Sequence, residues 1–188
     1  MKKAYSKQKK AIKERIIDFS KINGKENIFY ELCFCILTPQ SSALKCDQAV
    51  QELRKRDFYR KNFDPAPILK GLSRFHNTKA LRLKEMKLQY SSIKLERDYL
   101  VSNVKGIGWK ESSHFLRNIG HRDLAILDRH ILKHLVNHKA IKEIPKTLTP
   151  KLYLEIEKKF KQFSKKVKIP MDELDLLFWS SETGQIFK

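Results

Sequence analysis

The chain has 188 residues, of which 41% are hydrophobic and 32% are charged, and its 40 Lys and Arg against 21 Asp and Glu leave a formal net charge of +19. Such an excess is typical of a protein that binds a polyanion, most often nucleic acid. An anionic membrane surface is the alternative, but the sequence contains no basic amphipathic anchor helix. No stretch approaches the roughly 20 apolar residues of a membrane span. No apolar core follows the charged start, so we expect a cytoplasmic protein without a secretory signal.

Helical spacing of apolar residues dominates the first half of the chain. We expect five helical segments, at residues 11–19, 26–37, from Ser41 or Ser42 to about 56, 65–71 and 78–90. The second should stop at Thr38, because a residue before proline resists the α conformation. In the fifth segment the expected inward-facing residues are Leu81, Met86 and Tyr90.

The second half of the chain carries clear helix start and stop signals. Residues 99–104 lead into a glycine-containing turn, after which a helix runs to Ile119 and stops at Gly120. Further helices should begin at Asp128, at Thr149-Pro150 and at Pro170. Convincing strand alternation is absent, so the expected fold class is all-α.

Cysteine usage argues against a disulfide framework and against a metal site. The chain has three cysteines, and Cys33 and Cys35 lie inside an apolar run, where buried small hydrophobic residues are expected. The C-terminal region has no set of four cysteines, so we expect no iron–sulfur cluster. His134 and His138 are four residues apart, but no third ligand accompanies them. We therefore expect no metal site.

The turn Lys105-Gly106-Ile107-Gly108 lies between two helical patterns. Paired glycines allow a tight turn that brings backbone amides close to a ligand, and amides at a helix N-terminus suit a phosphate. Ile107 can anchor the turn in the core. On a chain of charge +19, the turn indicates binding of the DNA backbone, although a plain helix–helix turn would use the same residues.

Lys110 and Asp128 are the candidate catalytic residues. Lys110 falls in the first turn of the helix after the glycines, where the positive helix end and burial disfavour the ammonium form. A neutral amine is a nucleophile that can form a Schiff base with a sugar C1′. Asp128 begins the next helix, where it can act as an N-cap and also stabilise positive charge on a sugar or help to deprotonate the amine.

These residues resemble the helix-hairpin-helix DNA glycosylase superfamily. Gly106-Ile107-Gly108-Trp109-Lys110 and Asp128 are similar to its Gly-x-Gly-x-Lys hairpin and following Asp. Residues 36–43 resemble its Leu-Ser-x-Gln-Thr segment, and residues 75–80 its Phe-x-x-x-Lys-Ala helix start. The size, the lack of cluster cysteines and the C-terminal residues 175–188 are most similar to the type-2, archaeal and thermophile 8-oxoguanine DNA glycosylase/AP lyases. Lys105 stands where many relatives have Pro.

The resemblance implies a two-lobed fold over residues 1–188. The middle lobe would cover roughly residues 28–125, with the hairpin at 99–119, and the other lobe would combine the N-terminal helix with residues 126–188. It also implies that Pro39 and Gln40 lie at the lesion, with Gln40 filling the hole left by a flipped base, and that Lys188 contacts the damaged base. A flipped purine needs an aromatic slot. Phe75 and Trp179 are our candidates, with a plain core role as the alternative for both.

The sequence thus predicts a monomeric, nucleoid-associated enzyme that excises 8-oxoguanine from double-stranded DNA and nicks the strand through a lysine Schiff base. The resemblance implies no cofactor, apart from a monovalent cation at the hairpin carbonyls. Two alternatives stay open. One is an endonuclease III-like glycosylase/lyase for oxidised pyrimidines, and the other is a non-catalytic helix-hairpin-helix DNA-binding module.

Overall fold

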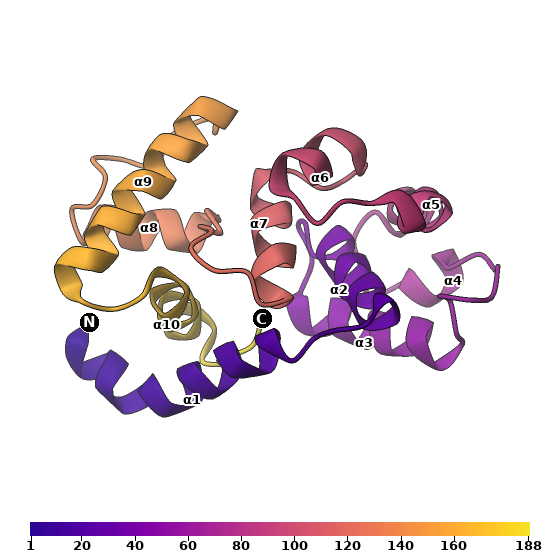
Figure 1. Cartoon of the computed structure of the whole chain (residues 1–188), viewed down its shortest axis with the longest axis horizontal. Helices are drawn as coiled ribbons and strands as arrows, with labels where there is room; N and C mark the ends of the chain where they lie inside the picture. Colours follow the sequence, from indigo (N-terminus) through magenta and orange to yellow (C-terminus); the bar gives the residue numbers. More distant parts are fainter. The chain divides into compact units, whose positions relative to one another are not determined.

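The computed structural model describes residues 1–188, and all of its regular elements are helices (Figure 1). Two compact units share the chain. The middle unit contains residues 22–115, and the terminal unit combines residues 1–21 with residues 116–188. None of the helices is both long and apolar enough to span a membrane.

The middle unit is built around one helix whose last nine residues are all buried. Its elements are α2 (Lys25–Leu37), α3 (Ala43–Lys55), α4 (Ala66–Leu69), α5 (His76–Gln89), the 3-10 turn η1 (Tyr90–Ser92), α6 (Arg97–Asn103) and the first part of α7 (Trp109–Asn118). Every residue of α2 from Phe29 to Leu37 is buried, and this helix packs against α3 and α5. The all-helical class predicted from the sequence is confirmed.

Two local expectations for the middle unit are wrong. Helix α2 ends at Leu37 as expected, but Thr38 keeps α-helical angles (φ −69°, ψ −29°), and its amide still donates to Phe34 O. The steric preference before proline is therefore overridden by one more helical hydrogen bond. In α5, Leu81 is 60% exposed, whereas Leu83 and Met86 are buried. The inward position predicted for Met86 is confirmed, whereas Leu83 takes the inward place predicted for Leu81.

The terminal unit buries its last helix against the first. It contains α1 (Lys2–Ser20), the end of α7, α8 (Arg129–Asn137), α9 (Pro150–Val167) and α10 (Met171–Thr183). Helix α10 is buried from Met171 to Phe178 and packs against α1, α8 and α9. The predicted cap at Thr149 is present, since its hydroxyl accepts the Leu152 amide at 3.3 Å.

All three cysteines are buried in the middle unit. Cys33 and Cys35 lie within α2, and Cys46 lies in α3, where its thiol donates to Leu37 O. Burial raises the pKa of Cys33 and that of Cys46 above the ordinary thiol value. The core position predicted for Cys33 and Cys35 is therefore confirmed, and Cys46 is a third buried cysteine.

Candidate active site

The hairpin turn links α6 to α7 within the middle unit. Val104 and Ile107 are buried and anchor the turn, and the Ile107 amide donates to Val104 O at 3.1 Å. Gly106 has φ +88°, a conformation that favours glycine, and a Cβ at this position would lie 2.7 Å from Arg82 Cδ. The exposed Lys105 pairs with Glu85 at 3.0 Å. The turn therefore has the tight geometry that the Gly-x-Gly spacing predicts.

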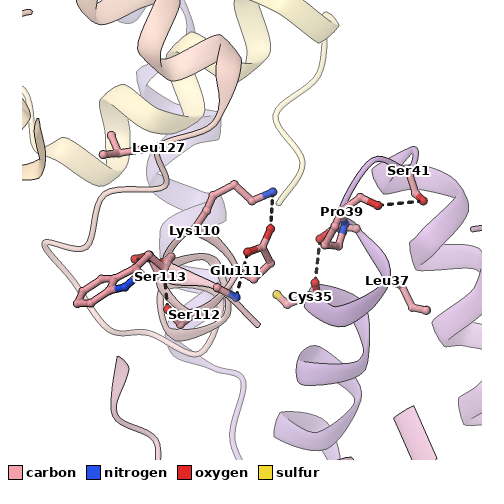
Figure 2. A network of polar contacts seen from close by, with 12 residues as sticks. Cys35, Leu37, Pro39, Ser41, Lys110, Glu111, Ser112, Ser113 and Leu127 are labelled. Atoms are coloured by element: carbon pink, nitrogen blue, oxygen red, sulfur yellow. Dashed lines mark hydrogen bonds and ion pairs between the residues drawn. The ribbon is translucent and has the colours of Figure 1, made fainter. Parts of the chain in front are cut away.

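Lys110 lies in the first turn of α7 and pairs with the next residue. Its Nζ is 3.0 Å from Oε1 of Glu111 (Figure 2), and the side chain is 28% exposed. The other oxygen of Glu111, Oε2, accepts the Gly108 amide at 3.2 Å. Gly108 is the residue before α7 and Glu111 is its third residue, which is the spacing of the glutamate in a capping box. One carboxylate thus contacts both the hairpin backbone and the lysine.

Glu111 is a residue that the sequence reasoning did not single out. The signal was present, because Glu111 follows Gly108 by three residues, the spacing at which a glutamate side chain reaches back to the amide that precedes a helix. His114, one turn later, is buried and packs edge-on against Phe34, with 5.7 Å between the ring centroids. It is held in the core of the middle unit.

Asp128 is the N-cap of α8 in the terminal unit. Its Oδ1 accepts the Ile131 amide at 2.8 Å, so one carboxylate oxygen is fixed by the helix end and Oδ2 remains for other contacts. The capping role expected for Asp128 is confirmed. Lys110 and Asp128 belong to different compact units, so their action on one substrate stays a prediction.

A buried ion pair lies in the same unit as Asp128. Asp175 of α10 is 3.4 Å from Arg117, and the Arg117 guanidinium also lies over the Phe19 ring, 4.6 Å from its centroid. Burial raises the pKa of Asp175 to about 7, and the charges of Asp128 and Asp172 act in the same direction, whereas Arg117 opposes them. Asp175 is therefore close enough to Asp128 for the two carboxylates to repel each other.

The proposed lesion-contacting residues divide between the units. Pro39, the exposed Gln40 and Phe75 lie in the middle unit. Phe75 is 57% exposed, which removes the core role considered for it. Its backbone, like that of Gln40, has positive φ, +57° and +56° respectively.

Trp179 and Lys188 lie in the terminal unit. Trp179 is half-buried in α10 and meets His130 edge-on, with 5.5 Å between the ring centroids. The segment that carries Lys188 is tied to α1, because Arg15 Nε donates to Phe187 O at 2.5 Å. The C-terminal residues thus have a defined place in this unit. No group of three or more His, Cys, Asp or Glu side chains is arranged to hold a metal ion.

The helices on either side of the anchored Gly-x-Gly turn, with a lysine in the following helix, define the helix-hairpin-helix DNA glycosylase fold. A family model described as 8-oxoguanine DNA glycosylase matches residues 12–169. The chain belongs to this 8-oxoguanine DNA glycosylase family.

Relatives from bacteria and archaea match nearly the whole chain. The 8-oxoguanine DNA glycosylase/AP lyase of Fusobacterium nucleatum is 43% identical, with 100% of this chain and 96% of that protein covered. The protein of the same name from Methanocaldococcus jannaschii is 37% identical, with 97% and 94% covered. The family predicted from the sequence is thereby confirmed.

Solved structures agree with the fold. The Methanocaldococcus jannaschii 8-oxoguanine glycosylase/lyase, crystallised with a 15mer DNA containing 8-oxoguanine, has a TM-score of 0.88 at 35% identity, covering 99% of this chain and 98% of that one. The 8-oxoguanine DNA glycosylase of Thermotoga maritima has a TM-score of 0.89 at 31% identity, with 100% and 96% covered.

Proposed function

We propose that this protein excises 8-oxoguanine from double-stranded DNA and then cleaves the strand 3′ to the abasic site. The observation that carries the proposal is Lys110 in the first turn of the helix after the hairpin, held by Glu111 within a chain of this family. A lysine in this place can reach a sugar C1′ once the nucleotide leaves the base stack.

The proposed reaction begins with DNA bound to the hairpin. The Ile107 and Gly108 amides already donate within the protein. A DNA phosphate is therefore assigned to the neighbouring amides, those of Gly106 and of Lys110 at the start of α7. Lys105 adds positive charge beside that phosphate. The proposal needs no cofactor, and a monovalent cation at the hairpin carbonyls would only strengthen phosphate binding.

Chemistry follows at the flipped nucleotide. The Lys110 ammonium first gives a proton to solvent. The resulting amine forms a bond to C1′ while the bond from C1′ to the base breaks, and the base leaves with the electron pair and takes up the proton that the nitrogen loses. Asp128 stabilises the positive charge that develops on the sugar. Opening of the sugar gives an imine, loss of a proton from C2′ then breaks the bond from C3′ to oxygen, and water finally releases the lysine.

Specificity for the lesion is assigned to two groups of side chains. Phe75 and Trp179 would hold the flipped purine, and Lys188 would contact its edge. Gln40, beside Pro39, would fill the place that the base leaves in the duplex. The enzyme would act as a monomer with two lobes. One lobe would consist of residues 28–125, and the other of the N-terminal helix and residues 126–188.

Borohydride trapping tests the nucleophile. With a duplex that holds one 8-oxoguanine, we expect a covalent adduct for the wild type and none for Lys110→Gln. Lys55→Gln is the matched control, because Lys55 is an exposed lysine on α3 of the same unit. An adduct that survives in Lys110→Gln would remove Lys110 from the mechanism. Excision by the wild type also rules out a non-catalytic DNA-binding module.

The lesion class is tested by a comparison of substrates. We expect faster excision of 8-oxoguanine than of thymine glycol, and the reverse order would favour the endonuclease III-like alternative. A variant without Lys188 should excise 8-oxoguanine more slowly but keep its affinity for an abasic duplex. Unchanged excision would remove Lys188 from the pocket.

A further inference from the structure

A buried lysine in the middle unit has no part in the proposed chemistry. Lys79 of α5 is only 1% exposed, and its ammonium lies within hydrogen-bond distance of four oxygen atoms, which share its three N–H groups. Two are the backbone oxygens of Leu37 and Pro39, at 2.6 and 2.8 Å. The other two are the hydroxyls of Ser41 and Ser73, both at 3.0 Å. A positive charge is favourable here, because Leu37 is the last residue of α2 and the C-terminal end of a helix carries a partial negative charge.

The two serines extend these contacts into a second loop. Ser73 donates to Leu37 O at 3.0 Å, and its hydroxyl lies 3.3 Å from that of Ser41. The Ser41 hydroxyl also accepts the backbone amide of Arg74 at 2.9 Å. Lys79, Ser41 and Ser73, which we call the Lys79 clamp, therefore join the loop of residues 38–41 to the loop of residues 73–75.

Each joined loop presents a residue in an unfavourable backbone conformation. Gln40 has φ +56° and Phe75 has φ +57°, in the left-handed region that residues with a Cβ rarely adopt. Such conformations persist only where the surrounding structure holds them. Gln40 directly precedes Ser41, and Phe75 directly follows Arg74, so the hydrogen bonds of the clamp act on both neighbours. Both side chains are exposed.

We propose that the Lys79 clamp sets the positions of Gln40 and Phe75, and so determines how the enzyme holds a flipped base and fills its vacated place. The inference rests on the proposed function and deepens it, since Lys79, Ser41 and Ser73 act as positioning residues without touching the substrate. A core that only needed volume would use an apolar side chain, whereas an ammonium with several fixed acceptors holds two loops in defined directions.

The electrostatic surroundings of Lys79 agree with this placement. Burial lowers the pKa of Lys79 to about 8. The positive charges of Arg82, Arg74 and Lys110 act in the same direction, so the clamp lies within electrostatic range of the candidate nucleophile. Figure 2 shows Pro39 and Ser41, which belong to the clamped loop, together with Lys110 and Glu111.

Single serine variants give the mildest test. Ser41→Ala and Ser73→Ala each remove one acceptor of Lys79, and we expect single-turnover excision of 8-oxoguanine to fall about tenfold. Cleavage of a duplex with a preformed abasic site should change less than about twofold, since it needs no lesion pocket. Ser42→Ala is the matched control, because exposed Ser42 makes no side-chain capping bond. A merely structural role would lower both activities together with the melting temperature, and that result would overturn the proposal.

A double-mutant cycle tests whether the clamp acts through Gln40. Lys79→Met should slow excision strongly in the wild-type background but only slightly in a Gln40→Ala background, because the same interaction is already lost. Lys79→Arg keeps the charge and should restore part of the rate. Fully additive effects of Lys79→Met and Gln40→Ala would contradict the proposal.

Amide hydrogen exchange separates failure of the clamp from failure of the proposed function. In Ser41→Ala the Arg74 amide loses its acceptor, so it should exchange at least about tenfold faster than in the wild type, while amides in α2 stay protected. Unchanged exchange at Arg74 would overturn the clamp whether or not the protein excises 8-oxoguanine. A wild type that neither excises nor nicks would overturn the proposed function, and with it the role of the clamp.

Discussion

The ammonium of Lys110 lies 3.0 Å from Oε1 of Glu111, the residue that follows it in α7. Because Oε2 of the same carboxylate accepts the Gly108 amide, the candidate nucleophile is tied to the hairpin that is proposed to bind the DNA backbone. A movement of the hairpin would therefore change the position of the Lys110 amine.

Removal of the Glu111 side chain should affect stability and chemistry separately. Glu111→Ala loses the cap on the Gly108 amide, so we expect a loss of about 1 kcal/mol in the free energy of unfolding. Glu111→Gln keeps an acceptor for that amide and should recover most of this stability. Both variants should trap the borohydride adduct about tenfold more slowly, because both lack the ion pair to Lys110. Wild-type trapping by Glu111→Gln would show that the ion pair does not orient the amine.

Substitution of Asp128 should separate capping from catalysis. Asparagine is as good an N-cap as aspartate. The free energy of unfolding of Asp128→Asn, measured in urea, should therefore lie within about 0.5 kcal/mol of the wild-type value. Excision of 8-oxoguanine by this variant should fall at least about 100-fold, since the variant lacks the negative charge that is proposed to stabilise the sugar. Asp128→Ala should lose the activity and also about 1 kcal/mol of stability. An Asp128→Asn protein with normal excision would leave Asp128 with a capping role only.

The hairpin glycine offers a prediction with an internal control. Gly106 and Gly71 both have positive φ, but a Cβ at Gly71 meets nothing within 4 Å, whereas one at Gly106 meets Arg82. Alanine at Gly71 should cost roughly 1 kcal/mol of stability through backbone strain, and alanine at Gly106 should cost more, because Arg82 must also move. Only Gly106→Ala should also weaken binding to an abasic-site duplex, as measured by fluorescence anisotropy. Equal loss of affinity in both variants would contradict the assignment of phosphate binding to this turn.

The buried Asp175 should make stability depend on pH. Because its pKa is raised to about 7, the folded protein holds a proton that the unfolded chain has already lost. The stabilisation is complete below the unfolded pKa of 3.8 and is lost as the pH rises through about 7. From about pH 5 to pH 8 the free energy of unfolding should therefore fall by on the order of 2 kcal/mol more in the wild type than in Asp175→Asn. If the free energy of unfolding depends on pH in the same way in both proteins, folding does not raise the pKa of Asp175.

Local signals in the sequence were sufficient for most helix ends and for the hairpin. Thr149 caps α9, Asp128 caps α8, and Gly106 occupies the positive-φ position of the turn, because each of these features depends on a few neighbouring residues. The angles of Thr38 were predicted incorrectly, since a hydrogen bond to Phe34 outweighs the preference before proline.

Tertiary contacts explain what the sequence left hidden. Lys79 is the lysine of the Phe-x-x-x-Lys-Ala segment, but its burial among four oxygen acceptors depends on tertiary packing and could not be predicted from the sequence. Leu81 and Leu83 are equally apolar, and which one faces inward depends on how α5 packs against α2. Glu111 could have been found from its spacing to Gly108, but its ion pair to Lys110 could not.

The burial of Cys33, Cys35 and Cys46 has a consequence for an enzyme that is proposed to repair oxidised DNA. Peroxides attack thiolates, and burial both shields these sulfur atoms and disfavours their thiolate forms. Oxidants that damage guanine therefore meet no exposed thiol on the protein. We therefore expect Cys33, Cys35 and Cys46 to stay unmodified under the oxidative stress that creates the proposed substrate.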